Sequence, residues 1–196
     1  MIRVVIATRN LGKLAELRRI LDGLEVELRS AEDLGLPEFE ETGETFFQNA
    51  LGKARAAAKA SGLPALADDS GLVVDQLGGE PGVRSARYAG LQADDQANLG
   101  LVLERLRFRP GRSARFVCVA ALVTPDGEEW TAEGVVDGHI VDEPRGEGGF
   151  GYDPIFQPVG ELRTTAEMSP EEKDAISHRG KAFRALRPAV AELLET

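Results

Sequence analysis

The sequence predicts an α/β fold in which helices flank a mixed β-sheet. First, an apolar run over residues 2–7 is followed by an amphipathic helix over residues 13–21, the pattern of a βα unit. Second, a strong helical stretch from residue 45 leads into another apolar strand. Third, residues 115–142 hold extended runs around a tight turn, which is typical of antiparallel pairing. Together these observations predict parallel and antiparallel strands in one sheet.

The first quarter of the chain gives a local signal for each element. Residues 2–7 are rich in Val and Ile, which favours a buried strand. Along residues 13–21 Leu and Ile recur every three to four positions, so this helix has one apolar face, and Gly23 ends it. A second strand is expected over residues 25–29, followed by an acidic, turn-prone loop over residues 30–44.

The next elements surround an acidic motif. Thr45 with Gln48 three residues later matches a capping box. An alanine-rich helix is expected from there to Ala60, with Gly62 as its end. The apolar strand that follows is expected to lead into a turn at residues 68–71, beyond which the chain continues extended.

In the second half, an amphipathic helix is predicted over residues 98–107. Two extended runs flank a turn sequence at residues 125–128, and a third strand is expected over residues 134–141. A glycine-rich loop occupies residues 147–154.

The C-terminal part is predicted to be helical. The pair Ser169-Pro170 starts a helix, and residues 178–195 form a closing helix with a kink near Pro188. No repeat or linker is evident, so we expect one domain over residues 1–196.

Composition and charge exclude several classes of protein. The 196 residues are 42% hydrophobic and 29% charged, and 33 acidic against 23 basic side chains give a net charge of −10. A nucleic-acid surface needs clustered positive charge, so no nucleic-acid partner is expected. No apolar stretch suits a signal peptide or a membrane span, and Cys118 is the single cysteine. We therefore expect a cytoplasmic protein without a membrane partner, with Cys118 in its core.

The stretch Ala67–Gly71, which contains Asp68, Asp69 and Ser70, is the strongest functional signal. Adjacent carboxylates repel and are costly to desolvate, so a fold that presents them after an apolar strand usually holds a cation there. Mg²⁺ is typically held by one or two carboxylates and substrate phosphates, and Glu40 with Asp69 would make that set. One aspartate can hold the metal while the same one or its neighbour orients a water. The alternative is a structural Asp-Ser turn.

Residues 8–13, Thr-Arg-Asn-Leu-Gly-Lys, join the first strand to the first helix. The first backbone N–H groups of a helix attract phosphate, and Lys13 adds a full positive charge. The segment lacks the spacing of a P-loop, so a solvated turn is the alternative. On the later helix, Asn49 and Lys53 lie on one face, either as site residues or as a solvated polar stripe.

Two further motifs lie in the second half. Phe150–Asp153 combines two aromatic rings with a glycine and an acid, which suits stacking on a nucleobase; packing of a ring in the core is the alternative. Ser177–Arg179 places a hydroxyl, an imidazole and a guanidinium in sequence, with Lys173 nearby, whereas His139 is taken as structural. No zinc-ligand spacing or nucleophile elbow occurs, so phosphate chemistry with Mg²⁺ remains the interpretation.

Taken together, these motifs resemble those of the inosine triphosphate pyrophosphatase family, house-cleaning enzymes that hydrolyse non-standard purine nucleoside triphosphates. The resemblance covers nearly the whole chain. It is carried by the segments Thr8–Lys13, Glu40–Gly43, Thr45–Phe46, Asn49–Ala50, Ala67–Gly71, Pro81–Val83, Ser85–Tyr88, Phe150–Phe156 and Ser177–Arg179. Arg9 stands where members often have glycine, so it receives no individual role.

The resemblance implies a long mixed sheet with flanking helices and two lobes, a central cleft for the substrate, and a cytoplasmic homodimer that requires Mg²⁺. Asp69 would be the general base and, together with Glu40, a metal ligand, while Lys13 would neutralise the triphosphate. The residues that would bind the substrate are Thr8, Arg9, Asn10, Leu11, Gly12, Lys13, Lys53, Ser70, Phe150, Gly151, Tyr152, Asp153, Lys173, His178 and Arg179.

The expected reaction is hydrolysis of ITP, dITP or XTP between the α and β phosphates, which gives the monophosphate and pyrophosphate. A hydrogen-bond donor at the 6-keto oxygen would exclude adenine, and His178, Arg179 or a backbone N–H could supply it. The rejection of guanine and the choice between ribose and deoxyribose stay open. The alternatives are a non-catalytic nucleotide sensor and a pyrophosphatase for modified pyrimidine nucleotides. A structural role would leave the carboxylate pairs unexplained.

Overall fold

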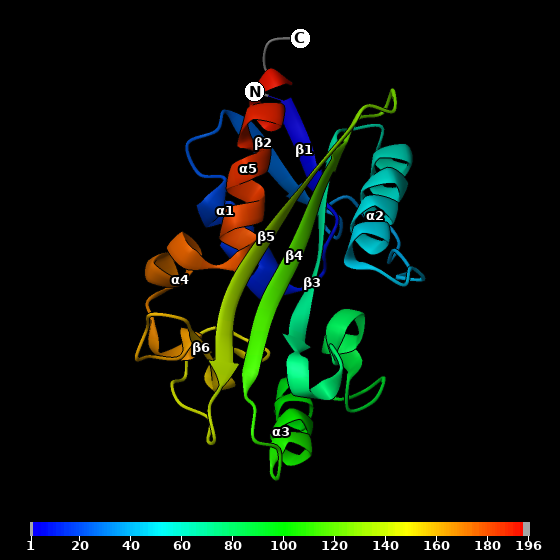
Figure 1. Ribbon diagram of the computed structural model, residues 1–196. Helices are drawn as coiled ribbons and strands as arrows, with labels where there is room; N and C mark the ends of the chain where they lie inside the picture. Colours follow the sequence, from blue (N-terminus) through cyan, green and yellow to red (C-terminus); the bar gives the residue numbers. More distant parts are fainter. Residues whose placement is uncertain (1, 194–196) are drawn as a thin grey trace. The chain divides into compact units, whose positions relative to one another are not determined.

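The strands form one mixed sheet, as the sequence predicts. The structure is a computed structural model in which residues 2–193 are described. Within them six strands pair in the order β2-β1-β3-β4-β5-β6; β1 is parallel to β2 and β3, and β6 is antiparallel to β5 (Figure 1). The strands are β1 Ile2–Ile6, β2 Val26–Ser30, β3 Ala65–Val74, β4 Ser113–Val123, β5 Glu129–Ile140 and β6 Phe156–Pro158.

The helices lie where the sequence predicts them. In the described residues they are α1 Leu11–Ile20, α2 Phe46–Ser61, α3 Asp95–Leu106, α4 Pro170–Ile176 and α5 His178–Glu192, with short 3₁₀ turns at Asp75–Leu77, Gly82–Arg87, Asp153–Ile155 and Thr165–Glu167. The closing helix runs continuously through Pro188, and the predicted residues 194–195 of that helix lie outside the described part of the chain.

Helix α2 shows how local chemistry sets its ends. The side chain of Thr45 accepts the N–H of Gln48 at 3.2 Å, and Gly62 adopts a φ of 67°. Such a φ is easily reached only by glycine, so Gly62 ends the helix. The predicted capping box is wrong in one respect, because Gln48 Oε1 accepts the N–H of Glu44 instead of that of Thr45.

Two strand predictions are wrong. Residues 68–71 form no turn, since β3 runs unbroken from Ala65 to Val74 between β1 and β4. β3 is also hydrogen-bonded to β4, and this pairing within the sheet outweighs the turn preference of Asp, Ser and Gly. The separate strand expected over residues 134–141 is the second half of β5, which has 12 residues beside the 11 of β4.

The described chain divides into two compact units. The first comprises residues 2–69, 118–134 and 179–193, and the second comprises residues 70–117 and 135–178. The three longest strands, β3, β4 and β5, contribute residues to both units. No helix of the described residues is long and apolar enough to cross a bilayer.

In the first unit, α1 and α5 lie on one side of the strands and α2 lies on the other (Figure 1). Alternate strand residues face these two layers. Val4, Ile6 and Leu66 pack in the cluster that includes residues of α1 and α5, whereas Val5 and Ala65 pack in the cluster that includes α2. This is the alternation of a strand covered on both faces. Cys118 is fully buried in the cluster that includes α1 and α5, which confirms its predicted place in the core.

The second unit has its own core. Leu72 and Val74 of β3 pack with apolar residues of α3 and with Phe116 of β4 and Phe156 of β6. Tyr152, from the glycine-rich loop, belongs to the same cluster.

Candidate active site

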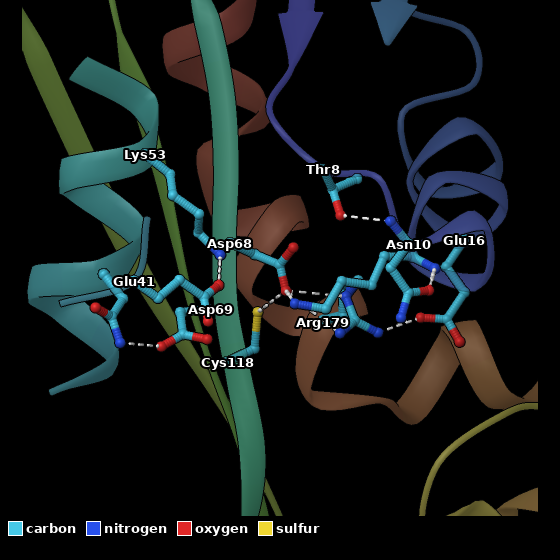
Figure 2. Close-up of polar contacts among 11 residues, drawn as sticks. Thr8, Asn10, Glu16, Glu41, Lys53, Asp68, Asp69, Cys118 and Arg179 are labelled. Atoms are coloured by element: carbon cyan, nitrogen blue, oxygen red, sulfur yellow. Dashed lines mark hydrogen bonds and ion pairs between the residues drawn. The ribbon is translucent and has the colours of Figure 1, made fainter. Parts of the chain in front are cut away.

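The adjacent aspartates of β3 point to opposite faces of the sheet in the first unit (Figure 2). Because side chains alternate along a strand, Asp68 shares a face with Leu66, and Asp69 shares a face with Ala67. Leu66 belongs to the cluster that includes α1 and α5, and Ala67 to the cluster that includes α2. The two carboxylates therefore meet different partners. Ser70 follows in β3 as a half-buried residue at the start of the second unit.

Two cations contact the carboxylate of Asp68. Its Oδ2 lies 3.0 Å from Nζ of Lys13 on α1 and accepts hydrogen bonds of 3.3 Å from Nε and Nη2 of Arg179 on α5. Nη1 of Arg179 donates to Oε2 of Glu16, also on α1 (Figure 2). Arg179 is 2% exposed and Glu16 is buried. Glu16, Arg179, Asp68 and Lys13 thus form a series of alternating charge, which we call the Asp68 network.

The charges of the Asp68 network determine its protonation. Burial alone would raise the pKa of Asp68, but Lys13 and Arg179 outweigh burial and hold that pKa well below its usual range. Burial alone would lower the pKa of Arg179, but Asp68 and Glu16 raise it. Removing one partner of such a buried ion pair typically costs about 3–5 kcal/mol. Asp68 is therefore an ionised anchor for Lys13.

Asp69 faces helix α2. Nδ2 of Asn49 donates to Oδ2 of Asp69 at 2.9 Å, and Lys53, one turn further along α2, forms an ion pair with Glu41. Asn49, Lys53 and Asp69 are buried, and Glu41 is half-buried. The predicted common face of Asn49 and Lys53 is therefore turned toward acidic groups, and a solvated polar stripe is ruled out.

The pKa of Asp69 shifts in the direction opposite to that of Asp68. Burial raises the pKa of Asp69; Lys53 lowers it in part, and Glu41 raises it further. Burial alone would lower the pKa of Lys53, but Asp68, Glu41 and Asp69 raise it, so Lys53 stays charged. Two neighbouring carboxyl groups with opposite shifts are the pattern by which enzymes separate a permanent anion from a proton acceptor.

Gly43 allows the loop before α2 to approach Asn49. The N–H of Gly43 donates to Oδ1 of Asn49 at 2.8 Å, and a Cβ at Gly43 would lie only 2.7 Å from the same oxygen. A residue with a side chain would have to move the loop away. Asn49 thereby links the segment that carries Glu40 and Glu41 to the carboxylate of Asp69.

The oxygen donors beside Asp69 fit Mg²⁺. Among residues 2–193, no three His, Cys, Asp or Glu side chains form a preformed metal cage. Mg²⁺ does not need one, because it binds one or two carboxylates plus substrate phosphates and keeps several waters. The charge of Glu41 contributes to the raised pKa of Asp69, and the neighbouring Glu40 is exposed. Asp69 and Glu41 are therefore neighbouring oxygen donors of the kind that Mg²⁺ binds, and Glu40 adjoins Glu41 in the chain.

The predicted phosphate segment forms the N-terminal cap of α1. Oδ1 of Asn10 accepts the N–H of Lys13 at 3.0 Å, and the N–H of Asn10 donates to Oγ1 of Thr8 at 3.2 Å (Figure 2). The other members of the segment are Arg9, which is exposed, and Leu11 and Gly12, which begin α1. The positive end of the helix dipole and the Lys13 side chain thus belong to one short stretch of chain.

A second polar cluster, in the second unit, is organised by Asp153. Its Oδ2 accepts the N–H of Phe150 at 2.8 Å and also Nζ of Lys173, and its Oδ1 accepts the hydroxyl of Thr165 at 2.8 Å. Nζ of Lys173 lies 4.7 Å from the centroid of the Phe150 ring. One buried carboxylate therefore joins the predicted residues of the glycine-rich loop to α4.

The other predicted residues of this loop have structural partners. Tyr152 is buried, and its hydroxyl donates to the carbonyl of Ser85 at 2.7 Å. For this ring the predicted alternative, packing in the core, is therefore the correct one. The N–H of Gly151 donates to Oδ2 of Asp95 at 2.6 Å.

His178 lies beside a small cavity of the second unit. Its ring stacks on that of Phe116, and the same cavity is lined by Asp153, Thr165 and Lys173. The structure thus brings the predicted residues Asp153, Lys173 and His178 to one cavity wall.

Sequence reasoning does not find Glu16. The sequence does contain a signal for it, because Glu16 lies on the same face of α1 as Leu17 and Ile20, which pack into the core. A buried acid at such a position requires a buried cation as its partner. That cation is Arg179, which the sequence assigns to substrate binding and the structure places on Asp68 and Glu16.

Comparisons with known proteins identify the family that this chain resembles. A model of the Ham1 family matches residues 4–189. A relative in Streptomyces coelicolor named dITP/XTP pyrophosphatase is 56% identical and covers 99% of this chain and 100% of its own length. One in Geobacter sulfurreducens with the same name is 53% identical, over 95% of this chain and 96% of its own length.

Solved structures are similar as well. A HAM1 protein from Coxiella burnetii superposes with a TM-score of 0.89 at 47% identity, covering 98% of this chain and 100% of its own. A structure described as nucleoside-triphosphatase / dITP/XTP pyrophosphatase from Mycobacterium abscessus gives a TM-score of 0.75 at 53% identity, covering 95% of this chain and 99% of its own. The similarity therefore extends over both units.

Proposed function

This chain belongs to the Ham1 family, and we propose that it hydrolyses dITP, ITP and XTP to the nucleoside monophosphate and pyrophosphate. The names of relatives that match it over nearly their whole length support the substrates dITP and XTP. ITP differs from dITP only in its sugar. The chain is accordingly a nucleoside triphosphate pyrophosphohydrolase.

The proposal rests most directly on the contrast between Asp68 and Asp69. Asp68 is neutralised by Lys13 and Arg179, so it serves to hold those cations. Asp69 is bound by an amide of Asn49, and its raised pKa makes it a better proton acceptor than an ordinary aspartate. Asp69 is therefore the general base that takes the proton of the attacking water.

The cations of the first unit bind the triphosphate. The segment at residues 8–13, through Lys13 and the amino-terminal end of α1, holds phosphate oxygens, and Lys53 adds a second charge. Arg179 acts through Asp68, which fixes Lys13 at 3.0 Å. Most of the rate arises from this positioning and from neutralisation of the charge that develops at the phosphates.

Asp69 and Glu40 are the proposed ligands of Mg²⁺. Glu41 is paired with Lys53. Glu40 is exposed, so a metal ion can replace the water that surrounds its carboxylate. When bound, Mg²⁺ supplies charge neutralisation at the phosphate oxygens.

The base is recognised by the cluster around Asp153. The ring of Phe150 offers a stacking surface, and Lys173 and His178 offer hydrogen-bond donors. A protein donor directed at the 6-keto oxygen would face the 6-amino group of adenine, which is also a donor. Two donors without an acceptor are costly in a dry pocket. Ser70, Gly151 and Tyr152 shape the surrounding segments.

A nucleotide panel tests this proposal. Purified protein is incubated with Mg²⁺ and with ITP, dITP, XTP, ATP, GTP or a modified pyrimidine triphosphate, and pyrophosphate and orthophosphate are measured separately. We expect pyrophosphate from ITP, dITP and XTP. Orthophosphate as the first product would contradict the proposal. Binding without turnover would indicate a nucleotide sensor, and preference for the pyrimidine would indicate the related pyrophosphatase.

The variant Asp69→Asn identifies the base. Proton transfer by a positioned side chain contributes about 10²–10⁴-fold, so we expect kcat to fall by at least about 10²-fold in a folded protein. Asp75→Asn is the matched control, because Asp75 has a side chain that is 54% exposed. Unchanged turnover in Asp69→Asn would remove Asp69 as the base.

We place this activity in a cytoplasmic homodimer. The chain has one cysteine, Cys118, which fits a reducing compartment. The dimer follows from the family resemblance alone.

A further inference from the structure

Phe116 and His178 form an aromatic stack in the second unit. Their ring centroids are 4.6 Å apart and their planes differ by 11°. The centroid of the Phe156 ring lies 4.4 Å from that of Phe116 at an interplanar angle of 55°. Phe116 is 7% exposed and belongs to the regular part of β4, so its ring has little freedom to turn.

The stack restricts the imidazole of His178. His178 is the first residue of α5, and an imidazole at a helix start can rotate about two side-chain torsions. A parallel ring at van der Waals distance favours one plane for the imidazole and therefore one direction for its N–H groups, which lie in that plane. This side chain is 7% exposed, so the stack acts where little water competes.

The same rings line the small cavity of the second unit. Its apolar wall includes Phe116, and its polar wall includes Asp153, Thr165 and Lys173. This cavity has room for about one water molecule, so it does not itself hold a base, but it shows that the His178 ring and the polar side chains proposed to recognise the base lie together. The direction of the His178 N–H therefore bears on which base edge is accepted.

We propose that Phe116 is a positioning residue that sets the plane of His178 and thereby the selectivity for 6-keto purines. This inference rests on the proposed function. Phe116 acts through His178, so losing the stack should weaken recognition of the base and leave the phosphate-binding residues of the first unit unaffected.

The variants Phe116→Leu and Phe116→Tyr test the proposal. Leucine keeps an apolar side chain but no ring, whereas tyrosine keeps the ring. In Phe116→Leu we expect KM for ITP to rise about 3- to 10-fold, which corresponds to the energy of an aromatic pair, with kcat nearly retained. Phe116→Tyr should restore KM. The preference for ITP over ATP, measured as the ratio of the kcat/KM values, should be lower in Phe116→Leu, which loses the stack.

Two measurements separate positioning from general damage to the core. Tripolyphosphate has no base, so its inhibition constant against ITP hydrolysis should stay the same in Phe116→Leu. Val102 is fully buried in the same core as Phe116, so Val102→Ala should lower the free energy of unfolding without altering KM for ITP. An equal rise in KM and in the tripolyphosphate inhibition constant, or an altered KM in Val102→Ala, would overturn the proposal.

NMR tests the stack in the wild-type protein, independently of any variant. The chain has two histidines, and His139 is exposed on β5, so it serves as an internal reference. The ring protons of His178 should show an upfield ring-current shift that those of His139 lack. Absence of that shift would overturn the inference even if the variants fail to fold.

The outcomes also distinguish this inference from the proposed function. If the wild-type protein hydrolyses ITP but Phe116→Leu keeps KM and base preference, only the inference is wrong. If the wild-type protein does not hydrolyse ITP, the proposed function is wrong and the inference falls with it.

Discussion

Glu40 and Glu41 are adjacent, yet they stand in different surroundings. Glu41 forms an ion pair with the buried Lys53, and Glu40 is exposed. A carboxylate already neutralised by a lysine gains less from a metal ion than one in contact with water. At the scale of single residues, this difference is the basis of our proposal that Glu40 holds the metal and that Glu41 orients Lys53.

The variants Glu40→Gln and Glu41→Gln should therefore behave differently. In Glu40→Gln we expect the Mg²⁺ concentration for half-maximal activity to rise about 10-fold, the effect of about 1.4 kcal/mol in binding. In Glu41→Gln we expect a smaller change in Mg²⁺ requirement and a higher KM for the nucleotide. Mg²⁺ titrations of ITP hydrolysis measure both. The reverse order would assign the ligand to Glu41.

Cys118 should make stability depend on pH in the alkaline range. Burial raises the pKa of its thiol, and Asp68, whose Oδ2 lies 3.8 Å from Sγ, raises it further. Because an unfolded thiol ionises near pH 8.5 while the folded one keeps its proton, the stabilisation is present below about pH 8.5 and is lost as the pH rises.

Urea unfolding at pH 7.5 and 9.5 measures this effect. We expect the free energy of unfolding of the wild-type protein to fall by about 1 kcal/mol more than that of Cys118→Ala between the two values. Equal losses in both proteins would show that the thiol does not contribute.

At the scale of elements, helix α2 carries the groups that face Asp69. Its amino-terminal turn is held by Thr45, whose Oγ1 accepts the N–H of Gln48. Asn49 begins the next turn and binds both Gly43 and Asp69. A frayed first turn would therefore disturb the site as well as the helix.

Replacement of Thr45 tests this coupling. An N-cap threonine changed to alanine typically costs about 1 kcal/mol, so Thr45→Ala should lower the free energy of unfolding by that amount, whereas Thr45→Ser keeps the oxygen and should lie within about 0.5 kcal/mol of wild type. Urea unfolding measures both variants. A similar loss in the two would mean that the hydroxyl is not the stabilising group.

At the scale of the whole molecule, the net charge of −10 contrasts with the cations at the proposed phosphate site. Lys13 and Lys53 are each paired with a carboxylate, so local contacts and not the overall charge must attract the triphosphate. The overall charge favours solubility.

The assembly is a separate prediction at this scale. From the family resemblance we expect a homodimer, and light scattering after size exclusion should give twice the mass of one chain across a range of concentrations. A mass equal to one chain would contradict the homodimer.

The sequence by itself determined the order of the helices and identified the segments to which we assign the chemistry. Thr45, Gly62 and the apolar periodicity of residues 13–21 act over a few residues, so local propensity suffices to predict the helices. The phosphate segment at residues 8–13 and the acids at residues 68–69 are contiguous motifs for the same reason.

Only the tertiary structure decided what those residues contact. Asp68–Ser70 have turn preferences, yet they lie in β3, which pairs with β4 in the sheet and stays extended. The alternation of β3 then directs Asp68 to α1 and α5 and Asp69 to α2. The pairing of Glu16 with Arg179 joins residues 163 positions apart, which no local pattern encodes. Long-range burial determines which charges neutralise one another, and therefore which of the two adjacent aspartates has the raised pKa that our proposal assigns to the proton acceptor.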